Sequence, residues 1–288
     1  MKRILITGAN GYLGRGIVSE ISKVGGYHIT ATDFSFTLSD GDTCGNIEKK
    51  ECNLFEVEDP YHYFGEPDVV VHLAWRKGFV HYADEHMADL PLHCRFIKKM
   101  AESDTERIAV MGTMHEVGFF EGSIKSDTPC HPESFYGIAK NALREYTRIL
   151  CRQNGKKLQW LRAYYIVGNS LKGSSIFSKI SEAAKNGNKT FPFTMGLNQF
   201  DFLDYDEFCR RVAMTVLQDE SLGIINICHG RPEKLADRVE RFIKENHFDI
   251  ALDYGKFPDR PYDSKAVWGD SREIDEIIKK VKLFEDLV

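Results

Sequence analysis

The chain has 288 residues, a formal net charge of −5 and an isoelectric point near 6.1, and 42% of its residues are hydrophobic. This composition is typical of a globular protein and argues against nucleic-acid binding, which needs a basic surface. No apolar run reaches the length of a transmembrane helix, and no Lys/Arg run favours a membrane surface. The length predicts one large unit with a smaller lobe.

Cysteine usage and the first residues favour a cytoplasmic protein. The seven cysteines are odd in number and include no CxxC pair, which argues against a disulfide framework and against a zinc knuckle. The opening MKRILITG is typical of a strand that runs into a glycine loop and not of a signal peptide.

Short apolar runs alternate with helical patterns through the first half of the chain. Apolar residues recur at helical spacing from Leu13 to Val24, and further helical patterns cover 86–103 and 134–153. Strands are predicted at Arg3–Thr7, His28–Asp33, Asp68–Leu73, Arg107–Met111 and Leu158–Tyr164. This alternation predicts crossover connections and a parallel sheet covered on both faces.

After about residue 168 the pattern changes. Helices are predicted at 174–186, 206–219, 233–246 and 272–282, with a short strand at Ile224–Cys228 and a loop at Phe257–Ser264. We therefore expect an α/β fold with a doubly wound Rossmann domain over 1–168 and a smaller, partly interleaved α/β substrate lobe over 169–288. The lobe should rest on the carboxyl edge of the sheet, where such sheets bind ligands.

A glycine-rich loop follows the first predicted strand and opens the first predicted helix. It reads Gly8-Ala9-Asn10-Gly11-Tyr12-Leu13-Gly14. Glycines permit the tight turn and let the backbone approach a pyrophosphate, and the helix N-terminus offers free N–H groups and the positive end of the helix dipole. The strand–loop–helix context predicts that this loop binds a dinucleotide.

Asp33 ends the second predicted strand, 19 residues after the last loop glycine. A carboxylate there accepts hydrogen bonds from the adenosine ribose and repels a 2′-phosphate, which favours NAD(H) over NADP(H); the alternative is a turn-capping residue. Asn53, followed by Leu54, comes after a third strand and belongs either at the adenine edge or in a turn. After the fourth strand comes Ala74, whose small side chain would let the ribose pack closely.

Tyr136 and Lys140 form a YxxxK pattern on a predicted helix, so the phenol and the ammonium share one face. A nearby cation favours the phenolate, which makes Tyr136 a usable acid/base for an alcohol–ketone pair. Thr113 lies 23 residues upstream at the end of a predicted strand and could polarise the same substrate oxygen. The alternative is an ordinary helix with an exposed Tyr and Lys.

In order and spacing, these motifs resemble the extended short-chain dehydrogenase/reductase family, in its NAD-dependent epimerase/dehydratase branch. The resemblance covers nearly the whole chain and rests on the glycine loop, Asp33, His72-Leu73-Ala74, Thr113 and the Tyr136/Lys140 pair. Segments 111–118, 201–206 and 260–263 look like three further family segments. The resemblance implies an NAD-dependent enzyme of nucleotide sugars, and a homodimer formed through the helix that carries Tyr136 and the helix before it.

Further site residues come from this resemblance. In nucleotide-sugar members, the arginine at the position of Arg260 contacts the nucleotide phosphates, a role that suits the guanidinium fork; the alternative is a surface salt bridge. Residues 72–77 are similar to a segment of UDP-galactose 4-epimerase whose lysine lies near the cofactor. That similarity places Leu73, Ala74, Trp75 and Lys77 at the cofactor.

The chain also departs from the family pattern. Met114 and His115 stand where nucleotide-sugar 4,6-dehydratases carry an Asp-Glu pair, so dehydration is not expected. Phe200 and Tyr165 replace an arginine and an asparagine that usually help to hold the diphosphate sugar. Met114 and Tyr165 are still expected to line the substrate pocket.

His115 lies two residues past Thr113, and the pKa of histidine suits it to proton transfer near pH 7. It is either a second acid/base, as in GDP-fucose synthase-like enzymes, or a residue that only lines the pocket. His81, His86 and His93 have a spacing that makes a poor metal site, and we interpret them as structural or surface residues. No metal is expected.

Three functions are consistent with these observations. The first is NAD(H)-dependent hydride transfer at a nucleotide-sugar carbon, most simply C4, by a 4-epimerase or by a 4-ketoreductase/4-dehydrogenase. The second is oxidation of a free sugar or uronic acid at C1, for which His115 and the lost diphosphate contacts are the markers. The third is a non-catalytic NAD(H)-sensing protein, against which the Thr-Tyr-Lys set argues.

Overall fold

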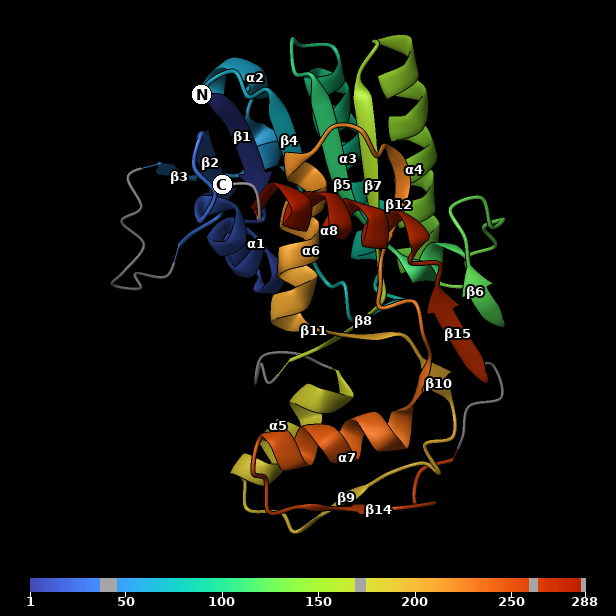
Figure 1. The fold of residues 1–288 in the computed structure, drawn as a ribbon. Helices are drawn as coiled ribbons and strands as arrows, with labels where there is room; N and C mark the ends of the chain where they lie inside the picture. Colours follow the sequence, from blue (N-terminus) through green and yellow to red (C-terminus); the bar gives the residue numbers. More distant parts are fainter. Residues whose placement is uncertain (37–45, 169–174, 259–263, 286–288) are drawn as a thin grey trace.

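A seven-stranded parallel sheet forms the centre of the protein in a computed structural model that describes residues 1–36, 46–168, 175–258 and 264–285. The strand order is β3-β2-β1-β4-β5-β7-β12, with neighbours in parallel register throughout (Figure 1). The strands are β1 (Lys2–Thr7), β2 (Tyr27–Asp33), β3 (Ile47–Glu51), β4 (Val69–His72), β5 (Arg107–Thr113), β7 (Lys157–Ala163) and β12 (Gly223–Ile227). The chain reverses its direction of travel across the sheet between β1 and β4, which creates a crevice at their carboxyl ends.

Helices cover both faces of this sheet (Figure 1). On one face α1 (Tyr12–Ser22) packs on α6 (Tyr205–Leu217), which in turn packs on α8 (Arg272–Glu285). On the other face α3 (Glu85–Ala101) packs along α4 (Phe135–Gln153), and the short α2 (Pro60–Tyr63) adjoins α3. The two buried apolar clusters correspond to these two faces, because both sides of a parallel sheet must be shielded from water.

The later part of the chain supplies smaller elements below the sheet in Figure 1. Two helices, α5 (Ile176–Lys185) and α7 (Leu235–Glu245), pack together with Phe177 edge-on to Phe242. Two pairs of short strands form small sheets: β9 (Thr190–Pro192) with β14 (Ala251–Asp253), and β8 (Tyr165–Val167) with β11 (Phe202–Asp204). A four-stranded sheet has the order β13 (Glu233–Lys234), β10 (Gln199–Phe200), β15 (Ala266–Gly269) and β6 (Gly122–Ile124).

The predicted Rossmann fold is confirmed, and the predicted strands and long helices lie within a few residues of the observed ones. β12 and its neighbours α6 and α8 belong to the main sheet although they follow residue 168. The division of the chain at 168 stays a prediction. The loop predicted at Phe257–Ser264 falls largely outside the described residues.

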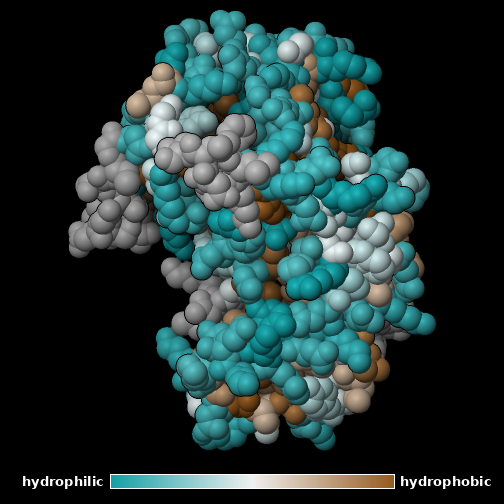
Figure 2. Space-filling view, viewed as in Figure 1, coloured by the Kyte–Doolittle hydropathy of each residue, from teal (hydrophilic) through white to brown (hydrophobic). Residues whose placement is uncertain are grey.

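The face seen in Figure 2 is predominantly hydrophilic, in keeping with the 28% of charged residues. Among the described residues, no helix is both long enough and apolar enough to span a bilayer.

The packing of α6 generates a stability prediction. Phe208 is completely buried in the core, whereas Phe257 is 54% exposed. Phe208→Ala is expected to lower the free energy of unfolding by about 3–5 kcal/mol, since it removes transfer energy and leaves a cavity. Phe257→Ala serves as the matched control and should lower it by less than about 1 kcal/mol. Denaturant unfolding followed by circular dichroism measures both, and equal losses would contradict the burial assigned to α6.

Candidate active site

The glycine loop lies in the crevice between β1 and β4. Gly8 has a φ of +69°, and a Cβ there would approach the Cα of Ala74 to 2.7 Å. A Cβ on Gly14 would collide with the carbonyl oxygen of Gly8. Gly11 precedes α1 and offers no side chain to cap the helix, so the first N–H groups of α1 point into the crevice. The loop has the form that a pyrophosphate needs.

Asp33 lies beside this loop at the end of β2. Its carboxylate accepts hydrogen bonds from the backbone N–H of Asn10 at 2.9 Å and of Phe34 at 2.8 Å. It therefore ties the loop to β2, and so has part of the capping role that was the alternative interpretation. Its side chain remains partly exposed, which leaves it accessible to a ribose.

Asn53 caps the short 3-10 helix η1 (Leu54–Glu56). Its side-chain oxygen accepts from the N–H of Phe55 and its amide nitrogen donates to Glu56 at 2.8 Å. This is the turn role that the sequence left open. Contact of Asn53 and Leu54 with adenine stays a prediction.

The segment after β4 is built around Trp75. Leu73 and Ala74 are partly buried, and the Ala74 N–H donates to Thr7 Oγ1 at 3.3 Å. The Trp75 ring stacks on His93 with centroids 4.4 Å apart and donates through Nε1 to His86 Nδ1 at 3.1 Å. Lys77 is exposed and has a φ of +60°. Cofactor contact by these residues stays a prediction.

Thr113, Tyr136 and Lys140 meet at the carboxyl end of β5. Thr113 is the last residue of β5, and its side chain lies close enough to the Tyr136 hydroxyl to oppose the rise in the pKa of that phenol, which burial causes. Ser134 caps α4 by accepting from the Gly137 N–H at 3.1 Å, and the helix then presents Tyr136 and Lys140 one turn apart. The structure thus brings the three predicted catalytic residues together.

Burial dominates the electrostatics of this group. Lys140 is 3% exposed, donates to the Met111 carbonyl at 2.8 Å and lies 3.9 Å from the centroid of the Trp75 ring. Burial lowers the pKa of Lys140 to about 7, while the Glu116 carboxylate raises it. Burial also raises the pKa of Tyr136, and its hydrogen bond with Thr113 lowers it. Because burial raises its pKa, the phenol is protonated at neutral pH.

His115 lies beside the group formed by Thr113, Tyr136 and Lys140. Its backbone N–H donates to Thr113 Oγ1 at 3.3 Å, and its ring centroid is 6.1 Å from that of Tyr136. Burial and the neighbouring His81 lower the pKa of His115 to about 3, so the ring is neutral at pH 7. With so low a pKa the ring is a weak base, and as a neutral imidazole it has one hydrogen-bond donor and one acceptor nitrogen.

His81 also belongs to this group, although sequence analysis placed it among structural or surface residues. Its ring stacks on that of Tyr136, with the centroids 5.2 Å apart and an interplanar angle of 16°. The centroid of the His81 ring also lies 4.3 Å from that of His115. Its carbonyl accepts from the Tyr136 N–H at 2.9 Å. No motif flanks His81, so periodicity alone could not have found it. His86 and His93 are buried, and in the described part of the chain no metal-binding group of three or more His, Cys, Asp or Glu occurs.

The predicted substrate residues have different settings. Met114 follows Thr113 directly in the chain, and its side chain is buried, with 6% of its surface exposed. Tyr165 is partly exposed and its ring packs on that of Phe200, tilted by 33° with the centroids 4.5 Å apart, so the two departures from the family pattern form one aromatic pair. Arg260 lies outside the described residues. Contact of Met114, Tyr165 and Arg260 with substrate stays a prediction.

A hollow of about 510 Å³ opens beside the N-terminus of α1. Tyr12 and Arg15 line it from α1, and Arg238 lines it from α7. The Tyr12 ring packs on Tyr205 at 4.5 Å, which holds α1 against α6. Leu13, in the first turn of the same helix, is partly buried against the core. The hollow therefore joins the glycine loop to the later part of the chain.

Glu116, a buried carboxylate next to the Thr113–Tyr136–Lys140 group, was not predicted from the sequence. It forms a capping box with Thr113, since each side chain hydrogen-bonds the backbone at the other end of the turn η2 (Met114–Glu116). The pattern Thr-x-x-Glu was visible in the sequence and is typical of such a box. Thr113 had been interpreted only through its hydroxyl.

With this geometry in view, the chain matches the model of the NAD dependent epimerase/dehydratase family over residues 4–228. The chain belongs to this family. It is 38% identical to dTDP-6-deoxy-L-talose 4-dehydrogenase (NAD(+)) of Aggregatibacter actinomycetemcomitans, over 92% of this chain and 98% of that protein. The family resemblance predicted from the sequence and the assignment as an NAD-dependent oxidoreductase or epimerase are confirmed.

Solved structures share the fold. A UDP-N-acetylglucosamine 4-epimerase of Methanobrevibacter ruminantium M1 matches with a TM-score of 0.83 at 18% identity, over 96% of this chain and 91% of that one. A UDP-glucuronic acid 4-epimerase of Bacillus cereus matches with a TM-score of 0.79 at 17% identity, over 96% and 93%. At these identities the likeness concerns the fold alone.

The glycine loop generates a binding prediction. Gly14→Ala should weaken NADH binding about tenfold or more, because the new Cβ displaces the Gly8 carbonyl and distorts the loop. Gly25→Ala is the matched control, since a Cβ there meets nothing within 4 Å. Titration of NADH fluorescence measures both variants. Unchanged binding by Gly14→Ala would show that the pyrophosphate lies elsewhere.

Proposed function

We propose that the chain catalyses NAD(H)-dependent hydride transfer at C4 of a nucleotide-activated 6-deoxy sugar, as a 4-dehydrogenase that also runs as a 4-ketoreductase. The observation that carries the proposal is the Thr113–Tyr136–Lys140 group at the carboxyl end of β5. This group lies at the same edge of the sheet as the glycine loop, which follows β1. The relative at 38% identity is named as a dTDP-6-deoxy-L-talose 4-dehydrogenase, which supports both the carbon and the class of sugar.

The residues present fit an NAD cofactor. The side-chain-free loop at Gly8 and Gly14, the uncapped start of α1 and the Asp33 carboxylate suit the pyrophosphate and the adenosine ribose. Asn10, Gly11, Tyr12 and Leu13 would complete the loop around the phosphates. A carboxylate at Asp33 repels a 2′-phosphate, so we assign NAD(H) rather than NADP(H).

Tyr136 would move the proton of the reaction. In oxidation the sugar hydroxyl gives its proton to the Tyr136 oxygen while its carbon loses a hydride; in reduction the ketone oxygen takes that proton back. Bound NAD(H) accepts or supplies the hydride. Thr113 would hold the same sugar oxygen, and charged Lys140 would favour the phenolate form of Tyr136.

His115 would face the sugar next to the reacting carbon, with Met114 beside it. As a neutral ring it can hydrogen-bond a sugar hydroxyl without adding charge. Tyr165 with Phe200 would offer an aromatic surface in place of the polar side chains that family members use. Arg260 would pair with the diphosphate.

A substrate panel tests the proposal. Wild-type protein with NAD⁺ and a dTDP-6-deoxyhexose should produce NADH in proportion to the 4-keto sugar seen by NMR, with NAD⁺ preferred to NADP⁺. An epimerase would interconvert C4 epimers without net NADH. If the protein instead oxidises free uronates, and Arg260→Ala leaves that activity unchanged, the proposal is wrong and the function is oxidation at C1.

Tyr136→Phe provides the decisive variant. It should reduce turnover at least about 1000-fold, because general acid–base catalysis is lost, and should leave NADH affinity within about twofold. Tyr82→Phe is the control, since this tyrosine is 70% exposed in the loop before α3. NADH binding with no turnover of any sugar by wild-type protein would indicate a non-catalytic NAD(H) sensor.

We also propose a cytoplasmic homodimer formed through α3 and α4. Large apolar side chains are exposed on these two helices: Met87, Phe135, Ile138 and Ile149. Exposed apolar groups of this kind favour a protein interface. Sedimentation at micromolar concentration would distinguish a dimer from a monomer.

A further inference from the structure

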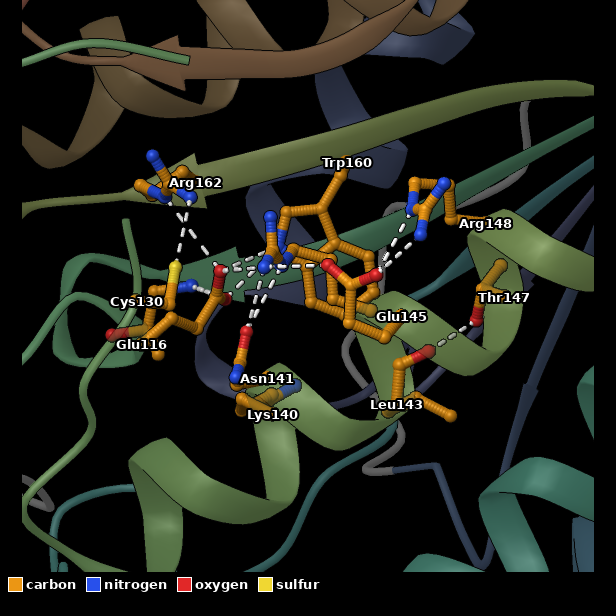
Figure 3. Close-up of polar contacts among 12 residues, drawn as sticks. Glu116, Cys130, Lys140, Asn141, Leu143, Glu145, Thr147, Arg148, Trp160 and Arg162 are labelled. Atoms are coloured by element: carbon orange, nitrogen blue, oxygen red, sulfur yellow. Dashed lines mark hydrogen bonds and ion pairs between the residues drawn. The ribbon is translucent and has the colours of Figure 1, made fainter. Parts of the chain in front are cut away.

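Glu116 is the fully buried carboxylate at the back of the catalytic group. Its side chain has no exposed surface, and Oε1 accepts the backbone N–H of Thr113 at 2.7 Å. The indole N–H of Trp160, on β7, donates to both carboxylate oxygens at 2.9 and 3.0 Å. Glu116 therefore holds the end of β5 at Thr113, the residue that lies beside Tyr136. Figure 3 shows the Glu116 carboxylate in polar contact with Trp160.

The surrounding backbone is shaped to admit this carboxylate. A Cβ on Gly112 would lie 2.7 Å from Glu116 Oε1 and would collide with the Trp160 indole nitrogen. A Cβ on Gly137 would collide with the His115 carbonyl, so the turn that carries Glu116 packs directly on α4 between Tyr136 and Lys140. Both glycines are needed for the close approach of the turn and the helix.

Two arginines face the carboxylate at ion-pair distance. Arg162 Nε on β7 lies 3.6 Å from Oε2, and Arg144 Nε on α4 lies 3.9 Å from it. Arg162 has no exposed side-chain surface, and its Nε has no hydrogen-bond partner, which makes the negative charge of Glu116 its main compensation. Arg144 also contacts Asn141 and pairs with Glu145 at 2.7 Å.

The other titratable groups around Glu116 come from three elements. Lys140 and Tyr136 face it from α4, Tyr164 from the position directly after β7, and Cys130 from the segment before α4. The carboxylate raises the pKa of each of these groups. Burial raises the pKa of Glu116 itself, and the two arginines, Trp160 and the Thr113 N–H lower it.

We propose that Glu116 is a positioning residue for the catalytic group: it holds Thr113 through the backbone and supplies a buried negative charge beside the Tyr136–Lys140 pair. The inference rests on the proposed hydride transfer, in which that pair handles the proton. Glu116 touches neither substrate nor cofactor and acts through the three residues that do. The arginines and Trp160 oppose the effect of burial on the carboxylate and hold it in place.

Glu116→Gln separates the charge from the hydrogen bond, because the amide oxygen can still accept the Thr113 N–H. Loss of the negative charge weakens proton binding at both Tyr136 and Lys140, so both groups titrate at lower pH. The rising limb of the pH profile for sugar oxidation should therefore move down by about half a unit or more, with the maximal rate within about tenfold of wild type. Glu116→Ala removes both functions and should also lower the maximal rate further.

Arg144→Met removes a positive charge from the same network and should move the limb in the opposite direction. Asp201→Asn is the matched control. Asp201 is also fully buried and is held by the backbone N–H groups of His229, Gly230 and Gly269. The pKa shifts of Tyr136 and Lys140 have other causes. Its neutralisation should lower stability and leave the limb in place. If Glu116→Gln fails to fold, Arg144→Met tests the proposal: an upward shift of the rising limb of the pH profile supports the charge effect, and no shift or a downward shift overturns it.

A second readout does not need turnover. The NMR titration of the Lys140 Cε resonance, assigned with Lys140→Met, should show a lower pKa in Glu116→Gln than in wild type. Normal turnover that depends on Tyr136, with no shift in the limb or in the lysine titration, overturns the role of Glu116 alone. If the wild-type protein turns over no sugar, the proposed function is overturned. A lower pKa of Lys140 in Glu116→Gln would still support the effect of the Glu116 charge in that case.

Discussion

The parallel register of the central strands determines where every candidate site residue lies. Because β1, β2, β4 and β5 run in one direction, their carboxyl ends meet at one edge of the sheet. The glycine loop, Asp33, Ala74 and Thr113 each follow or end one of these strands. The loop proposed to bind the dinucleotide and the group proposed to handle the proton are thereby brought together from residues that lie far apart in the sequence.

Much of this arrangement could be predicted from local patterns. The loop Gly8–Gly14 and the pair Tyr136/Lys140 carry their signal within a few residues, and alternation of strand and helix predicts the sheet that joins them. The short strands β6, β10, β13 and β15 gave no such signal. They contain two to four residues each and exist only because partners distant in sequence pair with them.

The site shows the same division. Thr113 could be predicted from its position at a strand end. The cluster of polar contacts around Glu116 could not, because Arg144, Trp160 and Arg162 reach this carboxylate from other elements. His81 escaped notice for a related reason, since only the fold of the loop before α3 brings its ring onto Tyr136. Sequence patterns identify the groups that act on a substrate more readily than the groups that hold those residues in place.

The contact between Trp75 and Lys140 has a practical consequence. The chain contains three tryptophans, and Trp75 lies with its ring 3.9 Å from the Lys140 ammonium, in the segment beside the glycine loop. A cation over an indole is held by the ring quadrupole and changes the polarity that the ring experiences. Trp75 is thus an intrinsic optical probe at the active site, whose emission would report the occupancy of the crevice and the charge of its lysine without any added label.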